Sequence, residues 1–168
     1  MAQKGNMPII EYHDTVSGKL ATLFLKYNGQ NLPLAQFKTL EARMGKSKTN
    51  SPRLGTTADM HRTGGWEGTG DGTMYYGTSV FLQMANLFNK QGKDIYVDLV
   101  VENDDPTSTL GTQGVLLKHV NFDEIPLAKF DVTSDEPLEM DLNFTFDDFE
   151  VLSTFTHPGA GQLVNPFL

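Results

Sequence analysis

Two hydrophobic patterns follow one another within residues 63–90 and divide this stretch into a strand and a helix. Over 68–76, glycine and apolar residues alternate with threonine and aspartate, the period of two that is typical of an extended strand. The apolar positions then recur at three- and four-residue steps, at Val80, Phe81, Met84, Leu87 and Phe88. This spacing predicts an amphipathic helix over 79–90, with Thr78 or Ser79 as N-cap and Gly92 beyond its end.

Further strands are predicted on both sides of this stretch, over 19–27, 34–44, 94–102, 115–122, 129–133 and 138–149. Asn28 and Gly29 indicate a hairpin turn after the first. Apolar residues in 34–44 also fall at three- and four-residue steps, so a short helix suits that segment as well. From 138 to 147 apolar and polar residues alternate strictly, which predicts one buried face and one acidic, solvated face.

The segment 45–65 is polar, contains Pro52 and shows no hydrophobic period, so we expect a long loop there, of the kind that is functional or disordered. Many strands and one helix predict a mainly β fold, an antiparallel β-barrel or sandwich with the helix against one side. The helix carries more apolar surface than one sheet face needs, and the last strand lacks proline and lysine. Both features favour contact with another subunit.

Composition limits the partners and the compartment of the protein. The 168 residues carry a formal net charge of -8, which disfavours wrapping nucleic acid because no basic face is available to release counterions. Cysteine is absent, so neither a disulfide nor a thiolate metal site is available. No apolar run approaches the length of a membrane span, so we expect a soluble cytoplasmic product without a membrane partner.

Catalytic and metal-binding motifs are not found. The histidines His13, His61, His119 and His157 are scattered and form no metal-binding or catalytic spacing. The acidic clusters at 104–105 and 147–150 lack the spacing of a calcium-binding loop. The glycine-rich run GWEGTGDGT is not followed by the lysine of a phosphate-binding loop. We therefore expect no enzyme activity, no cofactor and no metal.

The order of three segments is more informative than any site motif. These are GTGDGTMYYGTS with the helix after it, the block GTQGVLLKHVNFDEIPLAKFDV and the ending FTFDDFEV. Together they resemble the tail tube proteins of contractile phage tails, especially the family of the phage-like element PBSX. The resemblance covers 16–155, which defines a tube domain with the loop 45–65 and the helix 79–90. Residues 1–15 form an N-terminal arm and 156–168 a C-terminal extension, both outside the resemblance.

The resemblance implies a structural subunit that forms hexameric rings, which stack into a hollow tube within a contractile sheath. The implied partners are further copies of the chain, the sheath protein, and the baseplate and tape-measure proteins, with DNA only as transiting cargo. The implied location is a virion or a phage-tail-like particle such as a tailocin, assembled in the host cytoplasm. Strands from neighbouring subunits would join into one barrel that lines the channel, which removes the exposed sheet edges.

Candidate wall segments are 37–45, 69–76, 129–133 and 139–147. We expect Asp71, Glu139, Asp141 and Asp147 to face the channel, where a negative wall would repel DNA and prevent it from sticking; the alternative is that they are ordinary solvated strand residues. Candidate contacts between subunits or rings are Lys46, Lys48, Arg53, His61, Trp66, Phe81 and Phe88.

Two other classes of function stay open at this point. A carbohydrate-binding β-sandwich would use Trp66 with Tyr75 or Tyr76 as a stacking platform. A small hydrolase would use His61 with scattered carboxylates, although no spacing supports it.

Overall fold

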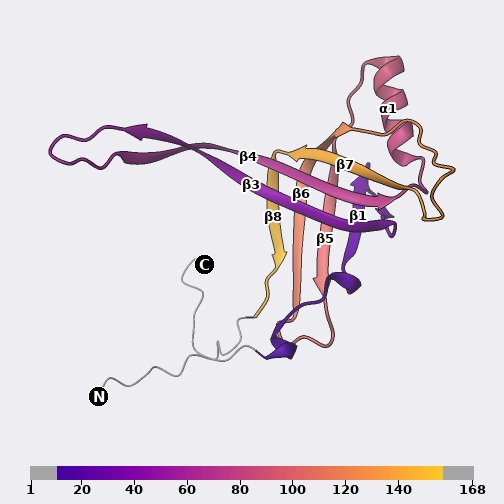
Figure 1. Ribbon diagram of the computed structural model, residues 1–168, viewed down its shortest axis with the longest axis horizontal. Helices are drawn as coiled ribbons and strands as arrows, with labels where there is room; N and C mark the ends of the chain where they lie inside the picture. The colour runs from indigo at the N-terminus through magenta and orange to yellow at the C-terminus, as the bar shows by residue number, and fades with distance from the viewer. Residues whose placement is uncertain (1–10, 157–168) are drawn as a thin grey trace.

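The structure, a computed structural model, describes residues 11–156 (Figure 1). The elements are two 3₁₀ turns, eight strands and one α-helix within that range: η1 (Tyr12–Asp14), η2 (Gly18–Leu20), β1 (Thr22–Tyr27), β2 (Gln30–Pro33), β3 (Phe37–Ser51), β4 (Met60–Tyr75), α1 (Val80–Gln91), β5 (Val97–Asp104), β6 (Thr112–Glu124), β7 (Glu139–Phe146) and β8 (Asp148–Ser153). This confirms the mainly β fold with one helix. The predicted N-terminal segment 1–15 and C-terminal extension 156–168 lie mostly outside the described residues.

The strands pair antiparallel in the order β2-β1-β5-β6-β7-β4-β3, and β8 also pairs with β6. One edge of β6 is shared: its first half pairs with β8 and its last residues pair with β7. Figure 1 shows the result, in which β3, β4 and β7 run across one end of β1, β5, β6 and β8. We call β3, β4, β7 and the end of β6 the wall sheet, and β2, β1, β5, β8 and the start of β6 the outer sheet.

The two sheets are joined where β6 bends at His119. Val97 pairs with Val120 and Leu99 with Leu117, so two residues of β6 lie opposite one residue of β5. This is a β-bulge, a feature that bends a strand and increases its twist. His119 adopts the left-handed conformation with φ of 55°, and its backbone N–H donates to the Asp98 carboxylate at 3.1 Å.

The hydrophobic core fills the angle between the sheets and is closed by α1. Its fully buried side chains include Met74, Phe81, Leu99, Val120, Leu142 and Phe144. Phe81 of the helix packs edge-on against Phe122, which packs edge-on against Phe144, so three elements meet in one aromatic row. The strict alternation predicted for the last strand is confirmed, because Met140, Leu142, Phe144 and Phe146 are all buried.

The bare glycine face of β4 has a steric reason. Gly68, Gly70 and Gly72 point into the core, and the rings of Phe146, Phe144 and Phe37 lie over them. A Cβ on Gly70 would stand 2.2 Å from the Phe144 ring. The glycines therefore make room for aromatic side chains from the neighbouring strands.

The helix prediction is confirmed, with bounds that differ by one residue at each end. α1 begins after Ser79, whose side chain makes no capping hydrogen bond to the described residues. Its last residue, Gln91, is followed by Gly92, which has φ of 62° and donates its N–H to the Phe88 carbonyl, the usual left-handed C-cap. The Asn28-Gly29 turn between β1 and β2 has positive φ at both residues, as a type I′ hairpin requires.

The prediction of a long loop over 45–65 is wrong. These residues are the outer halves of β3 and β4, which pair as far as Ser51 and Met60, so that only 52–59 connects them. Figure 1 shows this hairpin leaving the body of the molecule. We call its outer part, residues 45–65, the arm. Because both faces of the arm are exposed, its sequence carries no hydrophobic period, and the polar composition resembles that of a loop.

Two strand predictions need correction as well. Residues 129–133 are not a strand, because the Asp131 carboxylate accepts hydrogen bonds from the Thr133 N–H and hydroxyl and closes a turn. The predicted strand 138–149 is broken at Asp147 into β7 and β8. At this corner the Asp147 N–H donates to the Lys118 carbonyl, and the chain passes from the wall sheet to the outer sheet.

Candidate functional site

The polar face of the wall sheet is the first candidate surface. Asp71 of β4 pairs with Asn143 of β7, and Thr73 pairs with Asp141, so these side chains lie on the face opposite the core. Glu139 is two residues before Asp141 on the same face of β7. The structure thus brings three of the four predicted channel-facing carboxylates onto one surface. It places Asp147 away from them, at the β7–β8 corner.

Basic side chains on β3 partly neutralise this surface. Arg43 forms ion pairs with Asp71 and Glu41, and Lys38 forms one with Glu139. The ion pair with Glu139 raises the pKa of Lys38, which stays charged. Asp141 has no such partner among the described residues and accepts a hydrogen bond from the Thr73 hydroxyl at 2.7 Å. The sequence pattern had placed 37–45 at the wall but had not singled out these basic residues.

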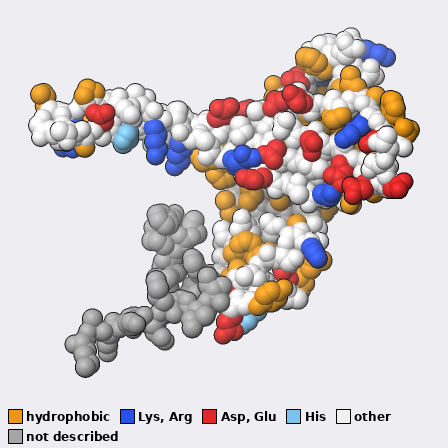
Figure 2. Space-filling model, viewed as in Figure 1, with side chains coloured by type: hydrophobic (Ala, Val, Ile, Leu, Met, Phe, Trp, Pro, Cys, Tyr) orange, Lys and Arg blue, Asp and Glu red, His pale blue; other side chains and the backbone are white. Residues whose placement is uncertain are grey.

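Acidic residues still outnumber basic ones on this face. The charged side chains of β3, β4 and β7 that lie there are Glu41, Glu67, Asp71, Glu139 and Asp141 against Lys38 and Arg43, which gives 2 − 5 = −3. Figure 2 shows this mixture of acidic and basic side chains over the wall strands. The surface is therefore polar and net negative, with both signs interspersed.

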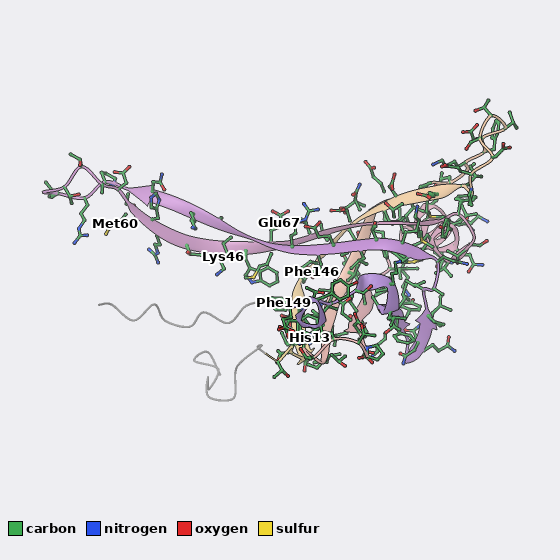
Figure 3. All side chains as sticks on the ribbon, turned by 60° about the horizontal axis from the view of Figure 1, so that its bottom comes forward. His13, Lys46, Met60, Glu67, Phe146 and Phe149 are labelled. Carbon is green, nitrogen blue, oxygen red and sulfur yellow. The ribbon has the colours of Figure 1, made fainter. Side chains whose placement is uncertain are left out.

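The arm is the second candidate surface and has the opposite charge. Lys46, Lys48, Arg53 and Arg62 are exposed there with Asp59 as the one acidic residue, so 4 − 1 gives +3. His61 is also on the arm, where its ring is hydrogen-bonded to the Asn50 side chain. Figure 3 shows Glu67 and Lys46 at the base of the arm on opposite faces of the ribbon. A basic extension thus projects from an acidic body.

An aromatic cluster fixes the base of the arm. Trp66 is 38% exposed and packs against Phe146 at 6.1 Å and edge-on against Phe149 at 5.9 Å between ring centroids. Tyr75 lies on the opposite face of β4 and Tyr76 just beyond its end, about 30 Å away at 3.3 Å per residue. The structure therefore does not bring Trp66 together with either tyrosine into a carbohydrate platform.

The helix is the third candidate surface, and one prediction on it was wrong. Phe81, expected at a contact between subunits, is 1% exposed and belongs to the core. The helix is apolar around most of its circumference, so the sequence could not tell which phenylalanine faces inward. Phe88 is 57% exposed and stays available for a partner, together with Leu82 and Leu87.

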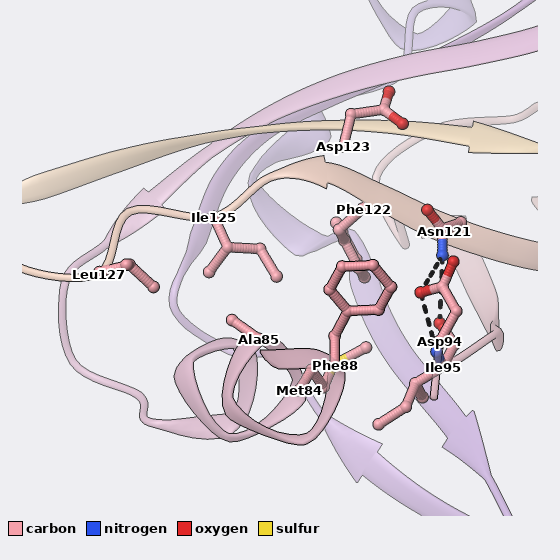
Figure 4. Close-up of a pocket in the computed structure, with 10 residues that line it drawn as sticks. All are labelled: Met84, Ala85, Phe88, Asp94, Ile95, Asn121, Phe122, Asp123, Ile125 and Leu127. Atoms are coloured by element: carbon pink, nitrogen blue, oxygen red, sulfur yellow. Dashed lines mark hydrogen bonds between the residues drawn. The ribbon is translucent and has the colours of Figure 1, made fainter. Parts of the chain in front are cut away.

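A groove of about 420 Å³ lies between α1 and the residues at and after the end of β6 (Figure 4). Its walls are mostly apolar, with Met84, Phe88 and Ile125 among them. The polar pair in it is satisfied, because the Asn121 side chain donates to the Asp94 carboxylate at 2.8 Å. Elsewhere, the described residues contain no group of three or more histidine, aspartate or glutamate side chains placed to hold a metal ion. No helix in 11–156 has the length and apolar character needed to cross a membrane.

Comparison with known proteins gives consistent matches. The model of a family described as phage tail tube protein matches residues 9–153. The phage-like element PBSX protein XkdM of Bacillus subtilis (strain 168) is 39% identical over 142 residues, which cover 84% of this chain and 93% of that protein.

Several solved structures share the fold. The anti-feeding prophage baseplate, 6-fold symmetrised, contains a chain that matches with a TM-score of 0.60 at 11% identity, over 87% of this chain and 96% of that one. The sheath–tube complex of an extracellular contractile injection system, PVC, in the extended state contains a chain that matches with a TM-score of 0.60 at 10% identity, over 79% and 88%. At these identities the likeness concerns the fold alone.

Proposed function

The chain belongs to the phage tail tube protein family, and we propose that copies of it join into hexameric rings that stack into a hollow tube within a contractile sheath. As a family member it is a structural tube subunit rather than an enzyme, and a component of a virion or a phage-tail-like particle. The six-fold symmetry of the anti-feeding prophage baseplate supports the number of copies, and the PVC sheath–tube complex supports the sheath.

One observation carries the assembly proposal: the wall sheet ends in an unpaired edge. β3 has 15 residues and, among the described strands, pairs only with β4. A long edge strand exposes backbone N–H and C=O groups that another chain can satisfy. If the wall sheets of neighbouring copies pair edge to edge, they close into one barrel and leave no edge exposed.

In this arrangement the polar face of the wall sheet lines the channel. Asp71, Glu139 and Asp141 are then on the lumen side, with Asp147 at the corner of the wall. The net negative face would keep a polyanion such as DNA from adhering during transit. The arm, with Lys46, Lys48, Arg53 and His61, would contact another copy, with Trp66 at its base, and Phe88 would face a partner on the outside.

Electron microscopy of the purified protein over a range of concentrations tests the assembly. We expect hollow rods of uniform width for the full chain. A variant in which 48–62 is replaced by a short turn should keep its β-sheet circular dichroism and form no rods. Persistent monomers of the full chain at every concentration, also after addition of the baseplate proteins, would refute the proposal.

Conductance of assembled tubes tests the lumen assignment. Asp71→Lys with Asp141→Lys should reduce cation selectivity and slow the passage of DNA. Glu102→Lys with Asp104→Lys makes the same change of charge on β5 of the outer sheet and serves as the control. Equal conductance and equal DNA passage in the two double variants would contradict the assignment. We further propose assembly in the host cytoplasm, with tape-measure protein and DNA as transient occupants of the bore.

A further inference from the structure

The chain leaves unpaired charges of opposite sign at the two ends of the wall sheet. At the outer end is the arm, whose four basic side chains take part in no ion pair within residues 11–156. At the other end, residues 123–138 comprise the last two residues of β6 and the connection that leads into β7 (Figure 1). They carry five acidic residues and one lysine, so 1 − 5 gives −4. None of these five carboxylates forms an ion pair within the described part of the chain either.

Exposed apolar side chains lie among the charges at both ends. At the tip of the arm, Leu54 is fully exposed and Met60 is half exposed. In the segment 123–138, Phe130 is 85% exposed and Val132 is 90% exposed. Apolar residues surrounded by polar and charged ones are the usual composition of an interface. Each of the two surfaces therefore has an apolar centre surrounded by charged side chains, and the charges on the two surfaces have opposite signs.

The segment between β6 and β7 is held in shape, although it is not a strand. Asp131 closes a turn with Thr133, and Ser134 accepts the N–H of Glu136 at 3.1 Å. The Lys129 ammonium donates to the Glu139 carbonyl at 2.7 Å and ties the segment to β7. These hydrogen bonds fix Phe130 and Val132 at the surface. A preformed surface loses less conformational entropy on binding than a loose one.

The two surfaces cannot meet within one copy. β3 spans 15 residues, about 50 Å in an extended strand, and separates the tip of the arm from the beginning of the wall sheet. Contact therefore requires a second copy of the chain. Because the two surfaces differ, the contact is head-to-tail, and a pair of copies keeps one free arm and one free receiving segment. Such a contact repeats until it closes a ring or extends a filament.

We propose that the tip of the arm of one copy docks on residues 123–138 of another copy, with Leu54 and Met60 against Phe130 and Val132. The arm's arginines face the carboxylates of Asp131, Asp135 and Glu136. The inference rests on the proposed function and adds to it the surface that receives the arm. Opposite charges steer the encounter, and the apolar centre provides the contact area.

Disulfide trapping tests this contact directly, because the chain has no cysteine of its own. Copies with Leu54→Cys are mixed with copies carrying Phe130→Cys and assembled under mild oxidation. We expect a covalent dimer as the main product. The control replaces the second variant with Tyr12→Cys, a residue of η1 that is 93% exposed. The neighbouring His13 carbonyl accepts the Thr109 N–H, so η1 lies at the connection between β5 and β6, away from the wall sheet. The control should yield at least about tenfold less dimer.

Charge reversal provides a second, independent readout. Arg53→Glu with Arg62→Glu should lower the yield of rods at low salt at least about tenfold, as should Asp135→Lys with Glu136→Lys. All four changes in one chain should restore most of the yield. Lys90→Glu with Lys93→Glu reverses the same number of charges at the end of α1 and should not reduce it.

The outcomes separate the two proposals. The docking inference is overturned if rods form normally, no disulfide-linked dimer appears and both charge-reversed variants give the normal yield of rods. The tube function would still stand in that case. Absence of rods from the full chain, together with absence of any cross-linked dimer from the Leu54→Cys and Phe130→Cys mixture, would overturn both. Loss of rods in both reversed variants without recovery in the fourfold variant would also count against the docking contact.

Discussion

Replacement of Gly70 by alanine should destabilise the subunit because the site has no room for a methyl group. The added Cβ would stand 2.2 Å from the Phe144 Cζ atom, 2.4 Å from Cε2 and 2.9 Å from the Glu41 carbonyl. Phe144 is itself 1% exposed and packs against Phe122, so its ring has little space to retreat. The carbonyl belongs to the paired strand β3 and moves only if the ladder shifts.

The expected cost is in the upper part of the range for overpacking, about 2–3 kcal/mol of unfolding free energy. For a domain of this length that corresponds to a decrease in Tm of about 4–12 °C. Gly65→Ala is the matched control on the same strand, since no atom lies within 4 Å of its added Cβ. It should be neutral or stabilising by up to about 1 kcal/mol, because alanine restricts the unfolded chain more than glycine does.

Urea denaturation of the monomer, followed by circular dichroism, measures both variants under the same conditions. Phe144→Leu removes the ring atoms that collide with the new Cβ. This substitution should therefore lower the free energy of unfolding less in the Gly70→Ala variant than in the wild type. If Gly70→Ala and Gly65→Ala gave equal stability, the aromatic packing described for the glycine face would be refuted.

Three further predictions concern the bend at His119, the orientation of α1 and the buried carboxylate of Asp105. His119→Val should lower the free energy of unfolding by about 1–2 kcal/mol because a β-branched residue disfavours positive φ, whereas His119→Gly should preserve it; equal values in urea melts would argue against the strained bend. Phe81→Ala should cost about 3–5 kcal/mol in the monomer, but Phe88→Ala less than about 0.5 kcal/mol, and reversed costs would contradict the orientation of α1. Hydrogen bonds from Thr107 and the Ser17 N–H lower the pKa of the buried Asp105 below its usual 3.8, so its contribution to stability is complete above that value and is lost as pH falls through the lowered pKa. Asp105→Asn should therefore reduce the difference in stability between pH 5 and pH 2, and an unchanged difference would count against this role.

The sequence predicted the elements that have one buried face and one exposed face. The strand β7 and the helix α1 each lie on the core with one side, so their hydrophobic periods are clear. The strands of the arm were not predicted because a ribbon that is exposed on both faces has no hydrophobic period in its sequence. For Phe81 and Phe88 the period was present, but an almost wholly apolar helix does not indicate which side is inward.

The sheet change at Asp147 depends on contacts far apart in sequence. The alternation of β7 stops at Asp147 and Asp148 and resumes in β8 with the apolar residues at odd positions, Phe149 and Val151. The two strands separate because they share one edge of β6, whose direction changes at His119. The shift of the alternation at Asp147 is a local signal for a break, but it does not indicate which sheet β8 joins, and His119 has no local signal for the bend. Of the acidic residues expected together, Asp147 was therefore the one that the structure places elsewhere, while Asp71, Glu139 and Asp141 followed from simple alternation.

The arm also determines how much of the free subunit is stably folded before assembly. Beyond the aromatic cluster at Trp66 it is a two-stranded ribbon with no core beneath it, and such a hairpin is marginally stable in water. In a free subunit its amide protons should exchange with solvent within seconds, while those of β5 and β6 stay protected for hours. The ordering entropy of the arm is then lost only when a second copy receives it. This loss raises the concentration at which free subunits make their first contacts.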